Sequence, residues 1–226
     1  MTNNITIDPK NPPHMTPEVQ QALSPQDCLE LLKAGNARFV DQSPHAHDHL
    51  ANVEATANGQ YPFAVILSCI DSRIPTEIVF DQSVGDVFNA RIAGNFVNTD
   101  ILGSMEFACA VAGSKLIVVM GHTSCGAVKG ACDHVELGNL TEMLKKLAPA
   151  VDGTPTKPGE DRSSANKDFV NRVAQKNVEL TMDQILNDSP VLNDLYELGK
   201  IGLVGAMYDV ATGRVSFGDL KVKYPA

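Results

Sequence analysis

Three short apolar segments, separated by stretches long enough to form helices, constrain the fold of this chain more than any other feature. Residues 63–68 form a continuous apolar run with β-branched members, which is typical of a strand buried on both faces. Residues 87–92 and 115–120 are further strand candidates. Residues 98–112 repeat apolar side chains at helical spacing, which indicates a crossover helix. Strands that alternate with helices in this way predict an α/β fold with a mostly parallel central sheet.

The flanking segments complete the expected architecture. Ser24, which is followed by proline and then by apolar residues, is a helix start signal, and we expect residues 1–58 to form an N-terminal arm of helices. Residues 59–226 would form the α/β core, with helices flanking both faces of the sheet. Within this core, residues 201–217 have the pattern of an antiparallel hairpin at the sheet edge. The 226 residues suffice for one core, so a single domain is expected.

Two polar stretches are expected to lie on the surface as loops. Residues 43–50 carry His45, His47 and His49 at alternate positions. Such a run could bind a metal, but we interpret it as a solvated segment. Residues 149–165 are rich in proline, glycine, serine and threonine, and we interpret them as a surface excursion that precedes a long amphipathic helix.

The charge and hydropathy of the chain exclude two kinds of partner. Its net charge is -9 and its pI is near 5.0, whereas nucleic-acid binding depends on Lys and Arg that neutralise phosphates. The most apolar segments are far shorter than the roughly 20 residues that cross a bilayer. Residues 1–13 are polar and lack the pattern of a secretory signal. We therefore expect no nucleic acid, no membrane span and a cytoplasmic location.

The cysteines are better suited to metal or thiolate chemistry than to a disulfide scaffold. There are five of them, an odd number in a chain too large to depend on disulfides. Cys28, Cys109 and Cys132 have no matching ligand partners in the sequence. Cys109 lies within an apolar helical pattern and is expected to be a core residue.

The other two cysteines and one histidine follow predicted strands. Cys69 comes directly after the first strand, and His122 and Cys125 come after the third. Open α/β sheets build sites at the carboxyl ends of their strands, so these three side chains can meet. Two thiolates and an imidazole suit tetrahedral Zn²⁺, and three protein ligands leave a fourth position for water or substrate. Either segment alone is weak, because a cysteine after a buried strand is more often a core residue; together they predict a catalytic zinc site.

Asp71 and Arg73 lie next to the first of these ligands. The guanidinium of Arg73 can hold the Asp71 carboxylate by a charge-assisted hydrogen bond and keep it ionised. An ionised carboxylate beside the metal can accept the O–H of a zinc-bound water and orient it. The alternative is an ordinary surface salt bridge at a strand end.

At these motifs the sequence resembles the β-carbonic anhydrases, from about residue 24 to residue 217. The C-x-D-S-R and H-x-x-C-G patterns of that family stand intact at 69–73 and 122–126, and residues 90–95 are similar to its R-N-x-A-N segment. The resemblance implies a lyase with one Zn²⁺ per chain, held by Cys69, His122 and Cys125, with Asp71 and Arg73 as the catalytic dyad. It would hydrate carbon dioxide reversibly to bicarbonate and a proton by zinc-hydroxide attack.

The same resemblance implies a substrate pocket. Gln60 would donate a hydrogen bond to bicarbonate, Phe88 and Phe107 would form an apolar wall, and Gly126 would supply a backbone donor. Ala93 stands where plant-like members often carry Val, and Phe107 where they carry Tyr. These departures concern the shape of the pocket and leave the chemistry unchanged.

The resemblance further implies a subgroup and an assembly. Ile66 stands three residues before the first ligand, where the allosteric bacterial members carry Trp, so the chain is similar to the plant-like, non-allosteric subgroup. A homodimer is the expected minimum assembly, with Phe107 reaching the pocket of the neighbouring subunit; a homotetramer is the alternative.

Two rival functions remain open at this point. An enzyme of the same fold could hydrolyse carbon disulfide or carbonyl sulfide with the same ligands and dyad. A zinc-bearing module without catalysis could use the metal only to cross-link two strand ends, although the intact Asp71 and Arg73 argue against that reading.

Overall fold

The structure, a computed structural model, describes residue 8 and residues 15–223. The beginning of the arm expected over residues 1–58, and nearly all of the N-terminal segment examined for a secretory signal, lie outside the described residues. Within the described part of the chain, no helix has the length and apolar character needed to cross a membrane.

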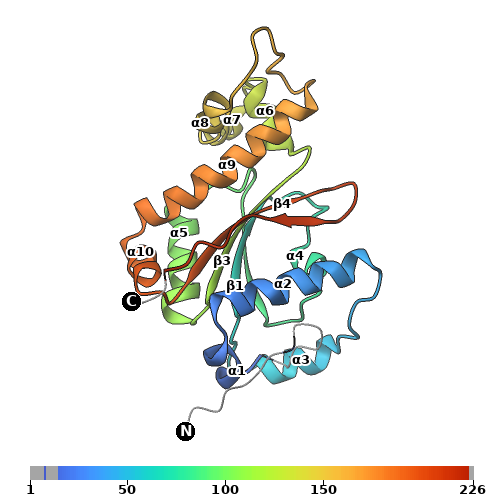
Figure 1. The fold of residues 1–226 in the computed structure, drawn as a ribbon, viewed down its shortest axis with the longest axis vertical. Coiled ribbons are helices and arrows are strands. Elements are labelled where there is room, and N and C mark those ends of the chain that lie inside the picture. Colours follow the sequence, from blue (N-terminus) through green and yellow to red (C-terminus); the bar gives the residue numbers. More distant parts are fainter. Residues whose placement is uncertain (1–7, 9–14, 224–226) are drawn as a thin grey trace.

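A five-stranded sheet forms the centre of the fold (Figure 1). Its order is β2-β1-β3-β4-β5; the first four strands are parallel, and β5 is antiparallel to β4. The strands are β1 (Ala64–Ser68), β2 (Val87–Arg91), β3 (Leu116–His122), β4 (Gly202–Tyr208) and β5 (Val215–Phe217). The structure thus confirms the α/β class, the three predicted apolar strands and the C-terminal antiparallel hairpin at the sheet edge.

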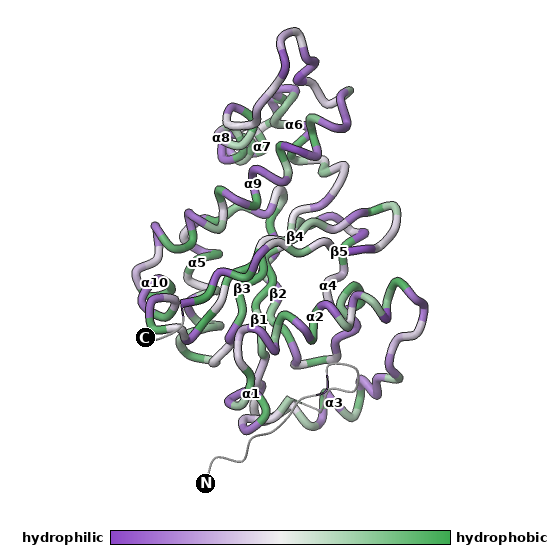
Figure 2. Tube along the Cα trace, in the orientation of Figure 1, coloured by the Kyte–Doolittle hydropathy of each residue, from purple (hydrophilic) through white to green (hydrophobic). Residues whose placement is uncertain are grey.

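Alternate residues of the strands face two different apolar layers. On one face, Ile66 and Val118 belong to the same cluster of buried side chains as Leu31 of the arm. On the other face, Val65 and Val119 belong to a second cluster. Figure 2 shows the central strands as predominantly hydrophobic tubes between more mixed helices. Both faces of β1 and β3 are buried, which explains why their sequences are apolar without alternation.

Helices cover both layers. One face carries α1 (Pro17–Ala22), α2 (Pro25–Val40) and α4 (Thr76–Val79), and the other carries α5 (Thr99–Glu106), the C-terminal half of α9 (Lys167–Asp188) and α10 (Pro190–Glu197). The N-terminal half of α9 extends beyond the sheet (Figure 1), where it packs on α6 (Gly126–Cys132) and α8 (Ala148–Gly153) beside α7 (Gly138–Leu144). Helix α9 therefore joins the sheet to this smaller helical group.

The predicted helix start at Ser24 is confirmed. The Ser24 hydroxyl accepts from the Asp27 N–H, and the Asp27 carboxylate accepts from the Ser24 N–H, at 3.2 and 2.9 Å. This reciprocal capping satisfies two of the N–H groups that a helix start leaves without partners. The following helix, α2, buries Leu29 and Leu32 against the sheet layer, whereas the next helix, α3 (His49–Thr56), has no buried residue.

The expected surface excursion over residues 149–165 is wrong for its first part. Helix α8 occupies residues 148–153 and buries Ala150 and Val151. Its proline lies in the first turn, where a missing N–H costs no helical hydrogen bond, so proline there starts a helix instead of preventing one. The long helix that follows is confirmed as α9.

The predicted crossover helix differs from a regular α-helix at its end. Helix α5 stops at Glu106, and residues Phe107–Val111 continue as a π-helix, η1. The wider turn changes the direction of the side chains that follow Glu106, and such turns are frequent at functional positions. Apolar spacing alone did not reveal it.

The interpretation of residues 43–50 as fully solvated is wrong for His47. Its Nε2 lies 2.8 Å from Oδ1 of Asp81, a buried carboxylate that also binds the guanidinium of Arg38. Burial alone raises the pKa of Asp81, but the hydrogen bonds from Arg38, His47 and the His45 N–H outweigh it and lower that pKa. The loop is therefore tied to the end of α4.

Candidate metal centre

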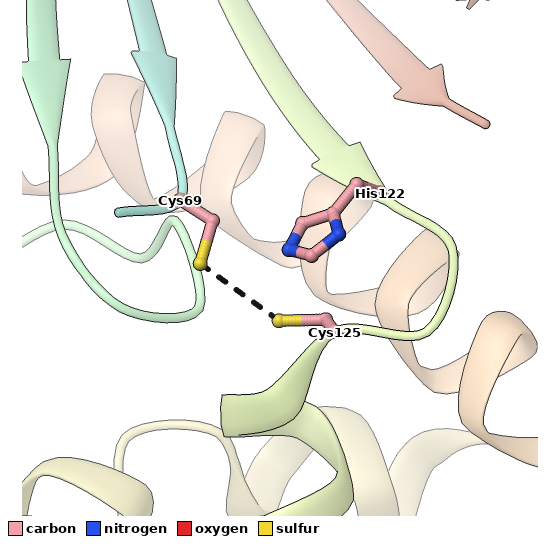
Figure 3. Close-up of side chains that lie close together, drawn as sticks. All are labelled: Cys69, His122 and Cys125. Carbon is pink, nitrogen blue, oxygen red and sulfur yellow. Dashed lines mark hydrogen bonds between the residues drawn. The ribbon is translucent and has the colours of Figure 1, made fainter. Parts of the chain in front are cut away.

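Cys69, His122 and Cys125 converge at the carboxyl edge of the sheet (Figure 3). Cys69 follows β1, His122 is the last residue of β3, and Cys125 is the N-cap of α6. Their ligand atoms all lie within 4.8 Å of one another, and the two sulfurs are 4.0 Å apart. All three side chains are buried. No other group of this kind occurs among the described residues.

The backbone between His122 and Cys125 explains how one short segment supplies two of the three groups. Ser124 has a φ of 58°, in the left-handed region, and its N–H donates to Oδ1 of Asn171 on α9 at 3.0 Å. This turn bends the chain directly after β3, so that the sulfur of Cys125 points towards that of Cys69, close to the ring of His122 (Figure 3).

The hydrogen bonds of His122 prepare one ring nitrogen for a metal. Nδ1 lies 3.0 Å from the carbonyl oxygen of Thr123, which can only accept, so Nδ1 carries the proton. Nε2 is then unprotonated, and it is buried without a hydrogen-bond partner among the described residues. A buried acceptor without a partner is costly, and a bound metal would satisfy it.

The two sulfurs lie within hydrogen-bond distance of each other and can share a proton. Donation from the Cys125 thiol, together with backbone N–H groups including that of Gly94, lowers the pKa of Cys69 to about 4 in spite of burial. The partly negative Cys69 sulfur, together with burial, raises the pKa of Cys125. The pKa of Cys69 is lowered because several hydrogen-bond donors converge on its sulfur. A divalent cation would replace the shared proton.

This donor set fits zinc. Two thiolate sulfurs and one neutral imidazole are borderline-soft ligands, and three protein ligands leave one tetrahedral position open. The unpartnered Nε2 of His122 is the observation that favours an ion here over simple packing of three side chains.

Asp71 and Arg73 form a two-bonded ion pair beside these residues. Arg73 donates from Nε to Oδ1 at 2.9 Å and from Nη2 to Oδ2 at 2.7 Å. These hydrogen bonds hold the pKa of Asp71 well below its usual range, against the effect of burial. Oδ2 of Asp71 also lies 4.0 Å from Nε2 of His122. A carboxylate that stays ionised therefore borders the space that the candidate ligands enclose.

Two further residues, given no role from the sequence, hold the segment that carries Cys69 and Asp71. Arg91 donates from Nε to the Cys69 carbonyl at 2.9 Å and from Nη2 to the Asp71 carbonyl at 2.6 Å. Tyr208 donates its hydroxyl to the Arg73 carbonyl at 3.3 Å. Both residues end a strand at the same edge of the sheet, and this position is the signal that could have found them.

The residues expected to line the substrate pocket are not all brought to the metal centre within one chain. Phe88 and Phe107 contact each other with ring centroids 6.1 Å apart and line a cavity of about 620 Å³ between β2 and α5. None of the three candidate ligands lines that cavity. Gln60 and Gly126 are exposed, and Ala93 is partly buried in the turn after β2.

The remaining cysteines are buried thiols. Burial raises the pKa of Cys109 to about 12 and that of Cys132 to about 11, and it also raises the pKa of Cys28. All three belong to the apolar clusters, as expected for Cys109. They have the character of core residues.

Comparisons with known proteins agree on one family. Residues 64–215 match a family model described as carbonic anhydrase. Carbonic anhydrase 2 of Mycobacterium tuberculosis is 34% identical over 205 residues, which cover 87% of this chain and 94% of that relative. The carbonic anhydrase of Mycolicibacterium smegmatis is 35% identical over 198 residues, 85% of this chain and 92% of the relative.

Solved structures give the same result. The β-carbonic anhydrase CafA of Aspergillus fumigatus superposes with a TM-score of 0.67 at 29% identity, covering 76% of this chain and 82% of that one. A structure of tetrameric β-carbonic anhydrases from Sordaria macrospora gives a TM-score of 0.65 at 28% identity, covering 82% of this chain and 94% of that one.

Proposed function

Because the chain belongs to the carbonic anhydrase family, and within it to the β class, we propose that Cys69, His122 and Cys125 form its zinc site. Carbonic anhydrases interconvert carbon dioxide and bicarbonate. The observation that carries the proposal is the convergence of three ligand atoms within 4.8 Å beside a carboxylate that Arg73 keeps ionised. The buried, unpartnered Nε2 of His122 supports a metal in that position.

A bound zinc ion would supply the acidity that brings the pKa of a coordinated water to about 7, so that attack on carbon dioxide is possible near neutral pH. The two thiolates and the imidazole would hold that ion and leave one corner open. Asp71 would accept the O–H of the attacking group and fix its direction, because its carboxylate is ionised and its Oδ2 lies 4.0 Å from Nε2 of His122. Arg73 would keep Asp71 in place through both carboxylate oxygens.

For the substrate we propose an apolar pocket that two chains complete. Phe88 and Phe107 would form its wall with Ala93, and the amide of Gln60 and the N–H of Gly126 would donate to bicarbonate. In one chain the Phe88–Phe107 cavity is separate from the candidate ligands, and Phe107 is 50% exposed. These facts support a homodimer, or a tetramer as in the Sordaria relatives, in which Phe107 serves the neighbouring subunit.

Other features of the chain also support self-association. Strand β2 is the outer strand of the sheet, with one row of backbone groups unpaired in this sheet. Val111, one turn after Phe107 in η1, is 74% exposed. Helix α3 of the arm buries no residue within its own chain, although it carries Leu50 and Val53. An arm of this kind is suited to packing on a second copy.

We also propose that the chain belongs to the plant-like, non-allosteric subgroup. Ile66 is fully buried in the apolar layer where the allosteric members carry Trp. Both oxygens of Asp71 accept hydrogen bonds from Arg73, which supports a role for this carboxylate as an acceptor and not as a fourth ligand. We expect the protein to be located in the cytoplasm.

The test is zinc content and hydration rate on the same purified sample. We expect about one zinc per chain and rapid hydration of carbon dioxide in a stopped-flow pH assay. Cys125→Ser should lose both zinc and activity, whereas Asp71→Asn should keep zinc and lose activity. Full activity in Asp71→Asn would refute the dyad. Sulfide release from carbon disulfide or carbonyl sulfide without hydration activity would favour the hydrolase alternative.

A further inference from the structure

Asn177 is a polar residue on the apolar face of α9. It is 3% exposed and lies among the buried residues Val173, Ala174 and Val178 of the same helix. A buried amide costs free energy unless it is hydrogen-bonded, so its partner indicates why it is there. Nδ2 of Asn177 donates to the carbonyl oxygen of Gly94 at 2.8 Å, in a buried contact across 83 residues of sequence.

Gly94 connects this contact to a candidate zinc ligand. Its N–H donates to the sulfur of Cys69, with an N–S distance of 3.4 Å. Gly94 has a φ of 82°, and a Cβ there would lie 2.8 Å from a methyl group of Leu147. The next residue closes a turn by donating from the Asn95 N–H to the Ile92 carbonyl at 2.9 Å. The two backbone groups of Gly94 therefore face Asn177 on one side and the sulfur of Cys69 on the other.

We propose that Asn177 is a positioning residue for the metal centre, acting through Gly94 to keep an N–H donor on the sulfur of Cys69. The inference rests on the proposed zinc site. An N–H hydrogen bond to a thiolate fixes the direction of the sulfur and withdraws electron density from it, and such outer contacts alter metal affinity by about 10–100-fold when removed. Without the amide of Asn177, the Gly94 carbonyl loses this hydrogen bond and the turn is free to shift its N–H away from Cys69.

A second buried asparagine provides the matched control. Asn36 is 4% exposed and donates from Nδ2 to the carbonyls of Val79 and Gly213, while its Oδ1 accepts from the Val215 N–H. None of these partners belongs to the metal centre. Replacing Asn36 removes a comparable buried amide without touching the hydrogen bond to Cys69.

The test compares Asn177→Leu with Asn36→Leu in full-length, metal-loaded protein. For Asn177→Leu we expect the zinc dissociation constant to rise at least tenfold, and the sulfur-to-metal charge-transfer band of the cobalt-substituted protein to shift. For Asn36→Leu we expect a lower unfolding midpoint but wild-type zinc affinity and an unshifted band. Asn177→Ser, which removes the long amide with less change in polarity, should repeat the first result if Asn177→Leu fails to fold.

The possible outcomes distinguish a failure of the positioning role of Asn177 from a failure of the proposed zinc site. Wild-type zinc affinity and an unshifted band in a folded Asn177 variant would overturn the positioning role while leaving the zinc site intact. Equal losses of affinity in the Asn177 and Asn36 variants would also overturn it, because the effect would then be one of general stability. A wild-type protein that binds neither zinc nor cobalt would refute the zinc site and the inference together.

Discussion

Arg91, the last residue of β2, donates a hydrogen bond of 2.6 Å to the backbone carbonyl of Asp71 on the neighbouring strand's loop. Its Nε donates to the Cys69 carbonyl at 2.9 Å, so one planar guanidinium fixes the segment that holds both a candidate ligand and the candidate dyad acid. Lysine has a single charged nitrogen and cannot reproduce this geometry.

Arg91→Lys should therefore lower the catalytic efficiency for carbon dioxide by about tenfold or more, with zinc retained. Stopped-flow kinetics and metal analysis measure the two quantities. Arg214→Lys, an exposed arginine in the turn between β4 and β5, serves as the control and should have wild-type rates. Wild-type kinetics in Arg91→Lys would show that Asp71 and Cys69 keep their positions without this bond.

Metal removal should expose a difference between two equally buried cysteines. Cys69 is 4% exposed and Cys132 is 6% exposed, but the pKa is lowered to about 4 for Cys69 and raised to about 11 for Cys132. Since the thiolate is the reactive form, N-ethylmaleimide at pH 6 should modify Cys69 well before Cys132 after chelation, and neither of them rapidly in zinc-loaded protein. Peptide mass spectrometry reports the order, and modification of Cys132 first would contradict it.

Asp81 should contribute to stability in a pH-dependent way. Its pKa is lowered in the folded chain, so its contribution is complete above the unfolded-state value of about 3.9 and is lost as the pH falls through the lower folded-state value. Asp81→Asn removes the carboxylate that pairs with the Arg38 side chain, which is 13% exposed. It should lower the free energy of unfolding by about 3 kcal/mol at pH 7. Asparagine tolerates the φ of 48° at this position.

Urea unfolding of both proteins at pH 7, 5 and 3.5 measures this difference. The decrease in the free energy of unfolding caused by Asp81→Asn should be similar at pH 7 and 5 and smaller at pH 3.5. Glu30→Gln is the control. It removes an ion pair whose partners are well exposed, 42% for Lys33 and 43% for Glu30, and should lower the free energy of unfolding by under ~1 kcal/mol at every pH. A difference that already shrinks between pH 7 and 5 would assign the pH dependence to a group other than Asp81.

The proposed dimer makes Val111 a sensitive position. A charge placed on this 74% exposed side chain, beside Phe107 in η1, should prevent burial of the surrounding apolar surface in an interface. We expect Val111→Arg to sediment as a monomer with reduced hydration activity. Leu198→Arg, at a 60% exposed apolar residue that ends α10, should keep the wild-type assembly. A wild-type protein that is monomeric and fully active would rule out the shared pocket.

Local pattern predicted the elements whose apolar residues are continuous in sequence. The strands β1 and β3 were readable because both of their faces are buried, and α2 because Ser24 and Asp27 cap it reciprocally. The π-helix after Glu106 was missed because a single wider turn leaves no distinct periodic signal. The helix that begins near Pro149 was missed because its six residues are too few to show a helical repeat of apolar side chains.

In the candidate site, too, residues that are neighbours in sequence could be predicted, whereas contacts between distant residues could not. Cys69, Asp71 and Arg73 are neighbours in sequence, and their proximity could be predicted from a strand end alone. Tyr208 reaches Arg73 across 135 residues, and Asn177 reaches Gly94 across 83. Contacts of this separation depend on the packing of β4 and α9 on the sheet, which one sequence does not specify.

The pairing of β1 with β3 gives the metal centre a role in the assembly of the chain. Ser68 is aligned with Met120, so Cys69 and His122 can share an ion in one alignment of the two strands only. A slip by one residue would turn the side chains of one strand to the opposite face and separate the sulfur from the imidazole. Metal binding would therefore stabilise the correctly aligned sheet, whereas misaligned folding intermediates would not bind the ion.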